Sequence, residues 1–249
     1  MPEKPSDWVS QKLGECPTED YMMSSLRDLA RVARAERLQV GIFGSVGVAA
    51  YLGFFHRRVG DLDIVVSSRQ APRLFKGWRA VRPFEDHKSH YLAEVGKGSA
   101  KHTIHVVING LKMMSRDRKE ILGEYSMRHA LHGCVQKGIR SCNVADPVRV
   151  SVLPIEDLIV TKLLAPVDAT TCLDLGILIG ACGTGAASGY RRILKANWVA
   201  RIVFSRIQDL VRVGRLCWAR QSRLPWGRVE VQLRGLMDLA QIRARRQRG

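Results

Sequence analysis

The stretch RRVGDLDIVVSS, residues 57–68, combines an apolar run with two aspartates, and it sets the fold that we expect for this chain. The run IVV is typical of a buried β-strand. Asp61 and Asp63 are two residues apart, so on a strand they share one face. Leu62 and Ile64 then point toward the core. Because ionised carboxylates are costly to bury alone, this pattern predicts either a divalent cation between the two acids or a strand edge with solvated acids.

A second motif lies just upstream of the aspartates. QVGIFG, residues 39–44, reads as a short buried strand, and SVGVAAYLG, residues 45–53, reads as a short helix. Gly44 and Ser45 stand where the strand becomes the helix. Glycine lets the backbone come close to a phosphate, and a helix N-terminus offers N–H groups and a positive dipole end. The motif predicts a phosphate-binding turn; the alternative is that Ser45 serves only as a helix N-cap.

The rest of the chain shows a mixed pattern first and a helical pattern later. Residues 19–38, 71–80 and 154–165 have helical spacing, whereas residues 89–96, 102–110 and 148–153 read as strands. From about residue 170 onward the pattern is helical. We therefore expect an α/β (α+β) fold with a mixed sheet flanked by helices in residues 1–165. A basic helical domain is expected in residues 166–249.

The charge balance is strongly basic. Forty Lys and Arg face 23 Asp and Glu, which gives a formal net charge of +17, and residues 191–249 hold 15 of the basic residues but only three acids. Such a surface favours polyanions: nucleic acid, nucleotides, an anionic membrane or an acidic partner. We expect RNA to contact the basic C-terminal region; the alternative is a solvated surface that aids solubility.

The cysteines and the N-terminal residues indicate the compartment. The six cysteines form no C-x-x-C pair, and the N-terminal sequence MPEKPSDW has no apolar stretch of the secretory kind. Free, mostly buried thiols in a reducing cytoplasm are the expectation. No apolar run reaches the length of roughly 18 residues that spans a membrane, so we expect no membrane partner.

The order of these motifs resembles the nucleotidyltransferase superfamily, the group with a DNA polymerase beta-like catalytic core. Its pattern is Gly-Ser or Gly-Gly at a strand-to-helix turn, then Asp-x-Asp, then a third acid on a later strand. GIFGSVGVAAYLG and RRVGDLDIVV look most like the small branch that contains abortive-infection toxins. Those sequences often carry an arginine four residues before the first aspartate, here Arg57.

A further motif strengthens the resemblance. LPIEDLIVTKLLA, residues 153–165, fits a helix that recurs in this branch, and a lysine in that helix can face the nucleotide phosphates. That lysine is Lys162 here, and Asp174 corresponds to a supporting acid; the alternative for Lys162 is a solvated helix face. The resemblance covers about residues 38–174, a little over half of the chain.

The resemblance implies an enzyme that moves a nucleotidyl group from NTP to an RNA (tRNA-like) or protein acceptor. Mg²⁺ or Mn²⁺ would be held by Asp61 and Asp63, and a toxin of this branch would be neutralised by an antitoxin protein. The NTP, as substrate, would be held by a set of four residues. This set is Gly44, Ser45, Arg57 and Lys162.

Two positions depart from the family pattern. Val59 stands where Ser or Thr is usual, and His105 stands where the third acid is expected. Histidine is a poor Mg²⁺ ligand but suits Mn²⁺, and as a neutral base it can accept a proton. His105 is therefore a candidate catalytic residue, with a satisfied, partly buried histidine as the alternative. A site that binds nucleotide or RNA without transfer is the alternative function.

The histidines also share a spacing. His87 and His90, like His102 and His105, are three residues apart. On a strand, such residues point to opposite faces, so this spacing does not favour a zinc site.

Overall fold

The computed structural model describes most of the first 195 residues and short pieces beyond them. The described residues are 20–57, 59–76, 78, 80–84, 87–95, 102–114, 121–141, 144–165, 169–180, 187–195, 199, 202–203, 206–208, 234–235 and 238. The chain forms two compact units: residues 1–111 with 126–153, and residues 112–125 with 154–249. We call them unit 1 and unit 2. From the sequence we predicted two domains, residues 1–165 and 166–249. That division into domains stays a prediction.

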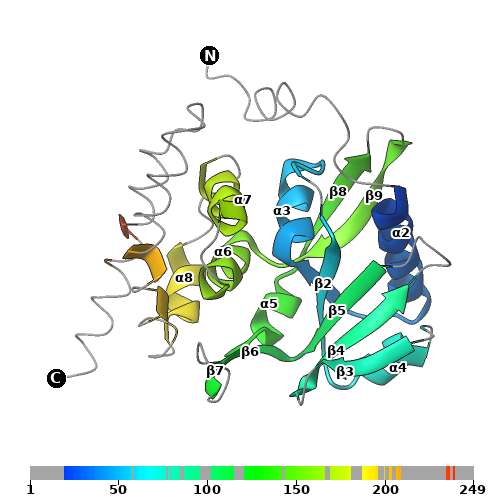
Figure 1. Cartoon of the computed structure of the whole chain (residues 1–249), viewed down its shortest axis with the longest axis horizontal. Helices are drawn as coiled ribbons and strands as arrows, with labels where there is room; N and C mark the ends of the chain where they lie inside the picture. The colour runs from blue at the N-terminus through cyan, green and yellow to red at the C-terminus, as the bar shows by residue number, and fades with distance from the viewer. Residues whose placement is uncertain are drawn as a thin grey trace. The chain divides into compact units, whose positions relative to one another are not determined.

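Unit 1 contains a seven-stranded mixed sheet with the order β3-β4-β5-β2-β1-β9-β8 (Figure 1). The pairs β1–β9 and β2–β5 are parallel, and the other four pairs are antiparallel. The predicted α/β class with a mixed sheet is thereby confirmed. The strands are β1 (Val40–Phe43), β2 (Asp61–Val66), β3 (Ala80–Phe84), β4 (His87–Val95), β5 (His102–Ile108), β8 (Val135–Ser141) and β9 (Val144–Val152).

β1 and β2 lie in the middle of this sheet, and their sequences explain why. All four residues of β1 are buried, as expected for a strand covered on both faces. β2 begins with an exposed Asp61 and a half-buried Asp63, and the residues between and after them are buried. The alternation places both carboxylates on one face of the strand, as predicted.

Helices cover both faces of the sheet in unit 1. Figure 1 shows α2 (Asp20–Ala35) and α4 (Ala71–Lys76) on one side, and α3 (Gly44–Leu52) and α5 (Arg128–His132) on the other. On the first side, Phe75 of α4 packs against Tyr91 of β4 with ring centroids 5.0 Å apart. On the other side, a Cβ added to Gly41 would lie 3.0 Å from the Cys134 sulfur, just after α5.

Two helices of unit 1, α2 and α3, end with left-handed residues. α3 ends at Gly53, which has φ 88° and donates its N–H to the Ala49 carbonyl at 2.8 Å. α2 ends in a Schellman motif, in which Leu38 donates to the Ala33 carbonyl and Arg37 donates to the Arg34 carbonyl. Arg37 has φ 50°.

Unit 2 contains a helical group. α6 (Ile155–Leu164) packs against α7 (Ala169–Gly180) and α8 (Ala187–Ile193), as Figure 1 shows. Pro154 is the N-cap of α6 rather than its first helical residue, and its fixed φ of −51° suits that entry. The pair β6 (Gly110–Met114) and β7 (Ile121–Ser126) forms a separate two-stranded sheet.

The helix that we predicted over residues 71–80 is too long. α4 ends at Lys76, and Ala80 already belongs to β3. Pairing decides this boundary, because Ala80 and Val81 lie opposite Glu94 and Ala93 of β4. β3, β6, β7 and β8 were not predicted.

Two further expectations are tested in the described part of the chain. Cys134 and Cys172 are free thiols, as predicted, and Cys172 is buried. The other four cysteines lie outside the described residues. Among the described helices, none is long and apolar enough to cross a membrane.

Candidate functional site

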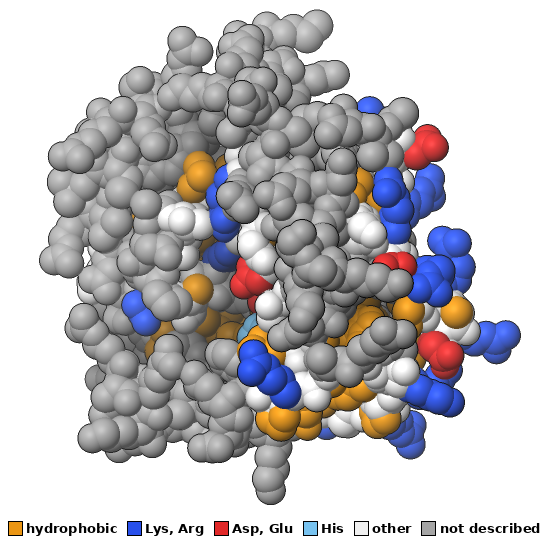
Figure 2. Space-filling view, turned by 45° about the vertical axis from the view of Figure 1, so that its right-hand side comes forward, with side chains coloured by type: hydrophobic (Ala, Val, Ile, Leu, Met, Phe, Trp, Pro, Cys, Tyr) orange, Lys and Arg blue, Asp and Glu red, His pale blue; other side chains and the backbone are white. Residues whose placement is uncertain are grey.

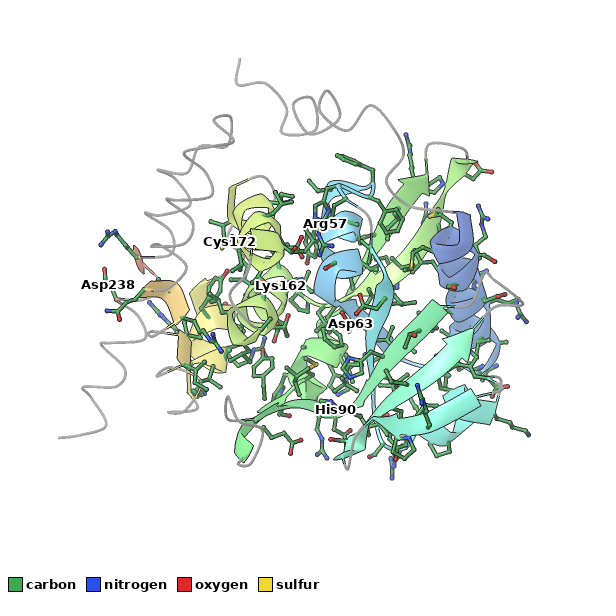
Figure 3. The ribbon with its side chains drawn as sticks, in the orientation of Figure 1. Arg57, Asp63, His90, Lys162, Cys172 and Asp238 are labelled. Atoms are coloured by element: carbon green, nitrogen blue, oxygen red, sulfur yellow. The ribbon has the colours of Figure 1, made fainter. Side chains whose placement is uncertain are left out.

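The two aspartates at the start of β2 form the centre of the candidate site in unit 1. Asp61 is exposed and the Asp63 side chain is 20% exposed, whereas Leu62 and Ile64 between and after them are fully buried. The strand therefore holds the carboxylates at the boundary between core and solvent. Figure 3 shows Asp63 on β2 beside α3.

Gly44, the first residue of α3, lies directly against Asp63. It has φ +65°, and a Cβ added there would lie 2.0 Å from Asp63 Oδ2. Both the backbone conformation and the close approach require glycine at this position. The strand-to-helix turn is thereby held against the carboxylate, which is how a phosphate-binding turn and a metal-binding acid would have to be arranged.

Ser45 and Arg57 add polar groups to the same turn. Arg57 follows α3 and donates a hydrogen bond from Nη2 to Ser45 Oγ. Phe43, and not Ser45, occupies the N-cap position of α3, so the alternative reading of Ser45 as the cap is wrong. A hydroxyl, a guanidinium and the backbone N–H groups of a helix N-terminus all suit an anion.

His105 lies beside Asp63 in the sheet. β2 and β5 are parallel, and their register places His105 directly opposite Asp63. His105 Nδ1 is 3.1 Å from Asp63 Oδ1, and the imidazole is 21% exposed. Because an ionised carboxylate only accepts hydrogen bonds, Nδ1 carries the proton in this pair. The imidazole therefore orients the carboxylate from the position where a third acid was expected.

His90 packs against His105, and sequence reasoning missed it. The His90 side chain is buried on β4, and its ring meets the His105 ring edge-on with centroids 5.3 Å apart. His90 lies opposite Val107 in the antiparallel β4–β5 pair, so it shares a face with His105. The signal lies in the register of two strands, whereas we considered only histidine spacing within each strand.

Lys162 and Asp174 lie in unit 2, where they form an ion pair between α6 and α7. Lys162 Nζ is 2.6 Å from Asp174 Oδ2, and Asp174 is fully buried. Figure 3 labels Lys162 on α6. With only 12% of its side chain exposed, Lys162 is not on a solvated helix face. Its predicted contact with nucleotide phosphates stays a prediction.

A second buried carboxylate in unit 2 was also missed. Asp157 of α6 accepts a hydrogen bond from the Tyr125 hydroxyl at 2.5 Å and one from Arg192 at 2.8 Å. Burial, together with the negative charge of Asp157, raises the pKa of Tyr125 well above its usual value. Burial and the charge of Glu156 raise the pKa of Tyr190 in the same way. The hydrogen bonds of Asp157 with Tyr125 and Arg192 join residues more than 30 positions apart, so no local sequence pattern predicts them.

The side chains around Asp63 fit a divalent cation that is bound partly by the protein and partly by substrate phosphates. Within the described residues, no three His, Cys, Asp or Glu side chains are arranged to hold a metal ion by themselves. Mg²⁺, however, is commonly held by one or two carboxylates together with substrate phosphates. Asp61 and Asp63 are the carboxylates that could hold such an ion, and the Gly44 turn, where phosphates could bind, lies directly against Asp63. The residues therefore fit a metal ion that arrives with a nucleotide.

Comparison with known proteins gives structural neighbours only. No protein-family model matches the chain, and no curated protein matches its sequence. ANT(2'')-Ia in complex with adenylyl-2''-tobramycin is 16% identical over 65% of this chain and 90% of that one, with a TM-score of 0.46.

Two further structures give similar values. The lincosamide antibiotic adenylyltransferase LnuA with bound lincomycin is 11% identical over 67% of this chain and 99% of that one, with a TM-score of 0.45. A nucleotidyltransferase-like protein from Paracoccidioides brasiliensis is 11% identical over 78% and 91%, with a TM-score of 0.44. Because the likenesses are this distant, we base the functional proposal on the residues of this chain.

Proposed function

We propose that this chain is a metal-dependent nucleotidyltransferase that uses NTP as its substrate. The observation that carries the proposal is the contact of Gly44 with Asp63, where a Cβ would lie 2.0 Å from Oδ2. A turn suited to phosphate and a carboxylate suited to metal thus share one place. Neither a solvated strand edge nor a simple helix cap requires that contact.

Each residue of the site has a role in the proposal. Asp61 and Asp63 hold Mg²⁺ or Mn²⁺, which supplies charge stabilisation at the phosphate oxygens during transfer. The backbone at Gly44, the Ser45 hydroxyl and the Arg57 guanidinium bind and orient the triphosphate. Orientation matters because in-line transfer depends mainly on positioning and electrostatics.

His105 has a positioning role in this proposal. Its Nδ1–H holds Asp63 Oδ1 at 3.1 Å, which fixes the carboxylate for metal binding. An acid at this position, in place of the N–H donor, would add an oxygen ligand of the kind that Mg²⁺ prefers. We expect His105→Asp, which supplies the third acid, to shift the metal preference of transfer toward Mg²⁺. Retention of the wild-type Mn²⁺ to Mg²⁺ rate ratio in that variant would argue against the role.

The decisive experiment measures transfer of α-labelled NTP with Mg²⁺ and with Mn²⁺. Wild type is compared with the double variant Asp61→Ala/Asp63→Ala and with the control Asp146→Ala, which removes an exposed acid of β9. The proposal expects labelling by wild type and the control only. Equal labelling by wild type and the double variant would overturn the mechanism.

The acceptor is identified with the same labelled NTP. Total RNA, including tRNA, and total protein are the acceptors that we expect, and a third arm offers tobramycin and lincomycin. If RNA is the acceptor, the enzyme acts as a toxin whose expression arrests growth, and an antitoxin protein relieves the arrest. Growth arrest by wild type but not by Asp61→Ala/Asp63→Ala tests that extension. Its failure would leave the transfer mechanism standing.

One observation favours a second function. His105 stands where a third acid is expected and contacts Asp63, which fits a site that binds nucleotide without transferring it. Calorimetry separates the two functions. Metal-dependent NTP binding that is lost in Asp63→Asn supports the transferase, whereas metal-independent binding without turnover supports the binding protein.

A further inference from the structure

A basic surface lies on the side of the unit 1 sheet opposite α3. Figure 2 shows Lys and Arg side chains along one margin, with few acidic side chains between them, on the side where Figure 1 places α2 and α4. Each of these side chains is exposed. We call this surface the α2–α4 basic face; its residues are Arg27, Arg31, Arg34, Arg37, Arg73 and Lys76.

The α2 arginines form a row. Arg27, Arg31 and Arg34 are separated by four and three residues, so they lie on one face of the helix. At 1.5 Å per residue, the row is about 10 Å long. Strand phosphates in a duplex repeat every 3.4 Å along the axis, so a row of this length faces about three phosphates.

The two helices hold their basic residues in a fixed arrangement. Arg73 of α4 donates hydrogen bonds to the Glu36 carbonyl and, at 3.4 Å, to its carboxylate. The Gln39 N–H donates to Gln70 Oε1 at 3.1 Å, which makes a second link between the end of α2 and the start of α4. Two acids lie among the described side chains of this face. Glu36 is paired with Arg73, and Asp28 is paired with Arg31. Basic charge therefore remains in excess.

Arg37 shows that a guanidinium is kept here at a conformational cost. It occupies the left-handed position of the Schellman motif, with φ 50°. Glycine fills that position at the lowest cost, because a Cβ disfavours left-handed backbone. The backbone therefore does not favour arginine at this position, and its exposed guanidinium adds to the charge of the face.

The chemistry of the face distinguishes between polyanion partners. Five of its six residues are arginine, whose planar fork matches phosphate oxygens. A helix that lies in a membrane interface, like the centre of a protein–protein interface, presents large apolar side chains. Among the described residues, the only exposed large hydrophobic side chain is Val135 of β8, which is not part of this face. We infer that the α2–α4 basic face binds the sugar–phosphate backbone of a nucleic acid.

The proposal is independent of nucleotidyl transfer, so it is tested by binding alone. Fluorescence anisotropy measures the affinity of the full chain for labelled 20-nucleotide single strands and duplexes, of RNA and of DNA, across a salt series. The test variant is Arg27→Gln/Arg31→Gln/Arg34→Gln, since glutamine keeps good helix propensity. The control Arg128→Gln/Arg140→Gln/Arg149→Gln removes three exposed arginines of unit 1 outside α2 and α4.

The expected result is a lower affinity and a shallower salt dependence for the test variant only. Each lost phosphate contact reduces the slope of log K against log salt by about 0.7 to 0.9, so three contacts reduce it by about 2 to 3. We expect at least a tenfold loss of affinity, about 1.4 kcal/mol or more. An equal loss in the control, or an unchanged slope in the test variant, would overturn the proposal.

Arg37→Gly separates binding from folding. Glycine relieves the left-handed backbone, so the thermal midpoint should equal or exceed that of wild type while nucleic acid affinity falls by about threefold to tenfold and the slope falls by about one. If the affinity of Arg37→Gly for nucleic acid were unchanged, Arg37 would not take part in binding. Tighter binding to poly-glutamate, or to vesicles rich in anionic lipid, than to nucleic acid would assign the face to an acidic protein or a membrane and would contradict the proposal.

Discussion

Asp63 in unit 1 and Asp157 in unit 2 are two carboxylates with opposite surroundings. Asp157 is fully buried, and its two oxygens accept bonds from Tyr125 and Arg192. Asp63 is partly exposed; the His105 imidazole lies 3.1 Å from its Oδ1, and Gly44 lies against its other oxygen. A carboxylate whose two oxygens are both bonded by its own chain has a structural role, whereas one held at the boundary between core and solvent, against the Gly44 turn, is accessible to a ligand. The same substitution should therefore have different effects at the two positions.

The largest expected effect is the loss of transfer in Asp63→Asn. Removing a group that acts on developing charge typically costs about 10²- to 10³-fold in rate, so the initial rate with labelled NTP should fall by at least 10²-fold. The urea midpoint should stay near that of wild type because Asp63 lies at the surface. If Asp63→Asn kept the wild-type rate, or if it failed to fold, the contrast between Asp63 and Asp157 would not hold.

Asp157→Asn should show the reverse. It leaves the Arg192 guanidinium, which is 34% exposed, without its charge partner and the Tyr125 hydroxyl without a charged acceptor, so we expect a loss of about 1 to 3 kcal/mol. Urea denaturation measures the loss. Asp146→Asn, at an exposed position of β9, is the matched control and should change stability by less than about 0.5 kcal/mol.

Gly44→Ala tests the contact that supports the site. The added Cβ meets Asp63 Oδ2 at 2.0 Å with φ at +65°, so we expect a loss of about 2 kcal/mol in stability and weaker NTP binding. Gly60→Ala is the control, because nothing lies within 4 Å of a Cβ added there. Equal stability of the two variants would mean that the turn is not held against Asp63.

The two buried tyrosines of unit 2 give a smaller contrast. Tyr125→Phe removes a hydrogen bond to a buried carboxylate, which costs about 1 to 2 kcal/mol. The Tyr190 hydroxyl is also buried, but no hydrogen-bond partner for it is found among the described residues. Tyr190→Phe should therefore be neutral or slightly stabilising in thermal denaturation. Destabilisation of both variants by the same amount would contradict this difference.

Alkaline pH should act on the same pair. The pKa values of Tyr125 and Tyr190 are raised by burial above the ordinary value near 10, so the folded chain keeps protons that the unfolded chain loses. Their contribution to stability is present below about pH 10 and declines above it, by up to about 1.4 kcal/mol per pH unit for each group. Urea midpoints between pH 9 and 11 should fall less in Tyr125→Phe/Tyr190→Phe than in wild type.

The sequence predicted the part of the site that local pattern determines. The buried run of β1, the helix that begins at Gly44 and the alternation of Asp61 and Asp63 are all set by neighbouring residues, and each was found as expected. His105 lies on a later strand than the two aspartates, as expected, and the parallel β2–β5 register places it opposite Asp63. The role of each of these residues stays a prediction.

The rest depended on contacts between distant residues. His90 meets His105 only through strand register, and the bonds of Asp157 to Tyr125 and Arg192 bridge 32 and 35 positions. The edge strand β8 carries Gly138 in its middle and lacks an apolar run, so periodicity did not reveal it. The basic C-terminal region on which we placed RNA binding lies mostly outside the described residues, and that expectation stays a prediction.

The crossover between the parallel strands β2 and β5 has a modular consequence. It carries α4, β3 and β4 before β5 delivers His105 next to Asp63. One continuous segment, residues 67–108, therefore supplies Arg73 and Lys76 of the α2–α4 basic face, as well as His90 and His105. If related chains exchanged this segment, the residue beside the aspartates and part of the α2–α4 basic face would change together. Asp61, Asp63 and the Gly44 turn would remain in place.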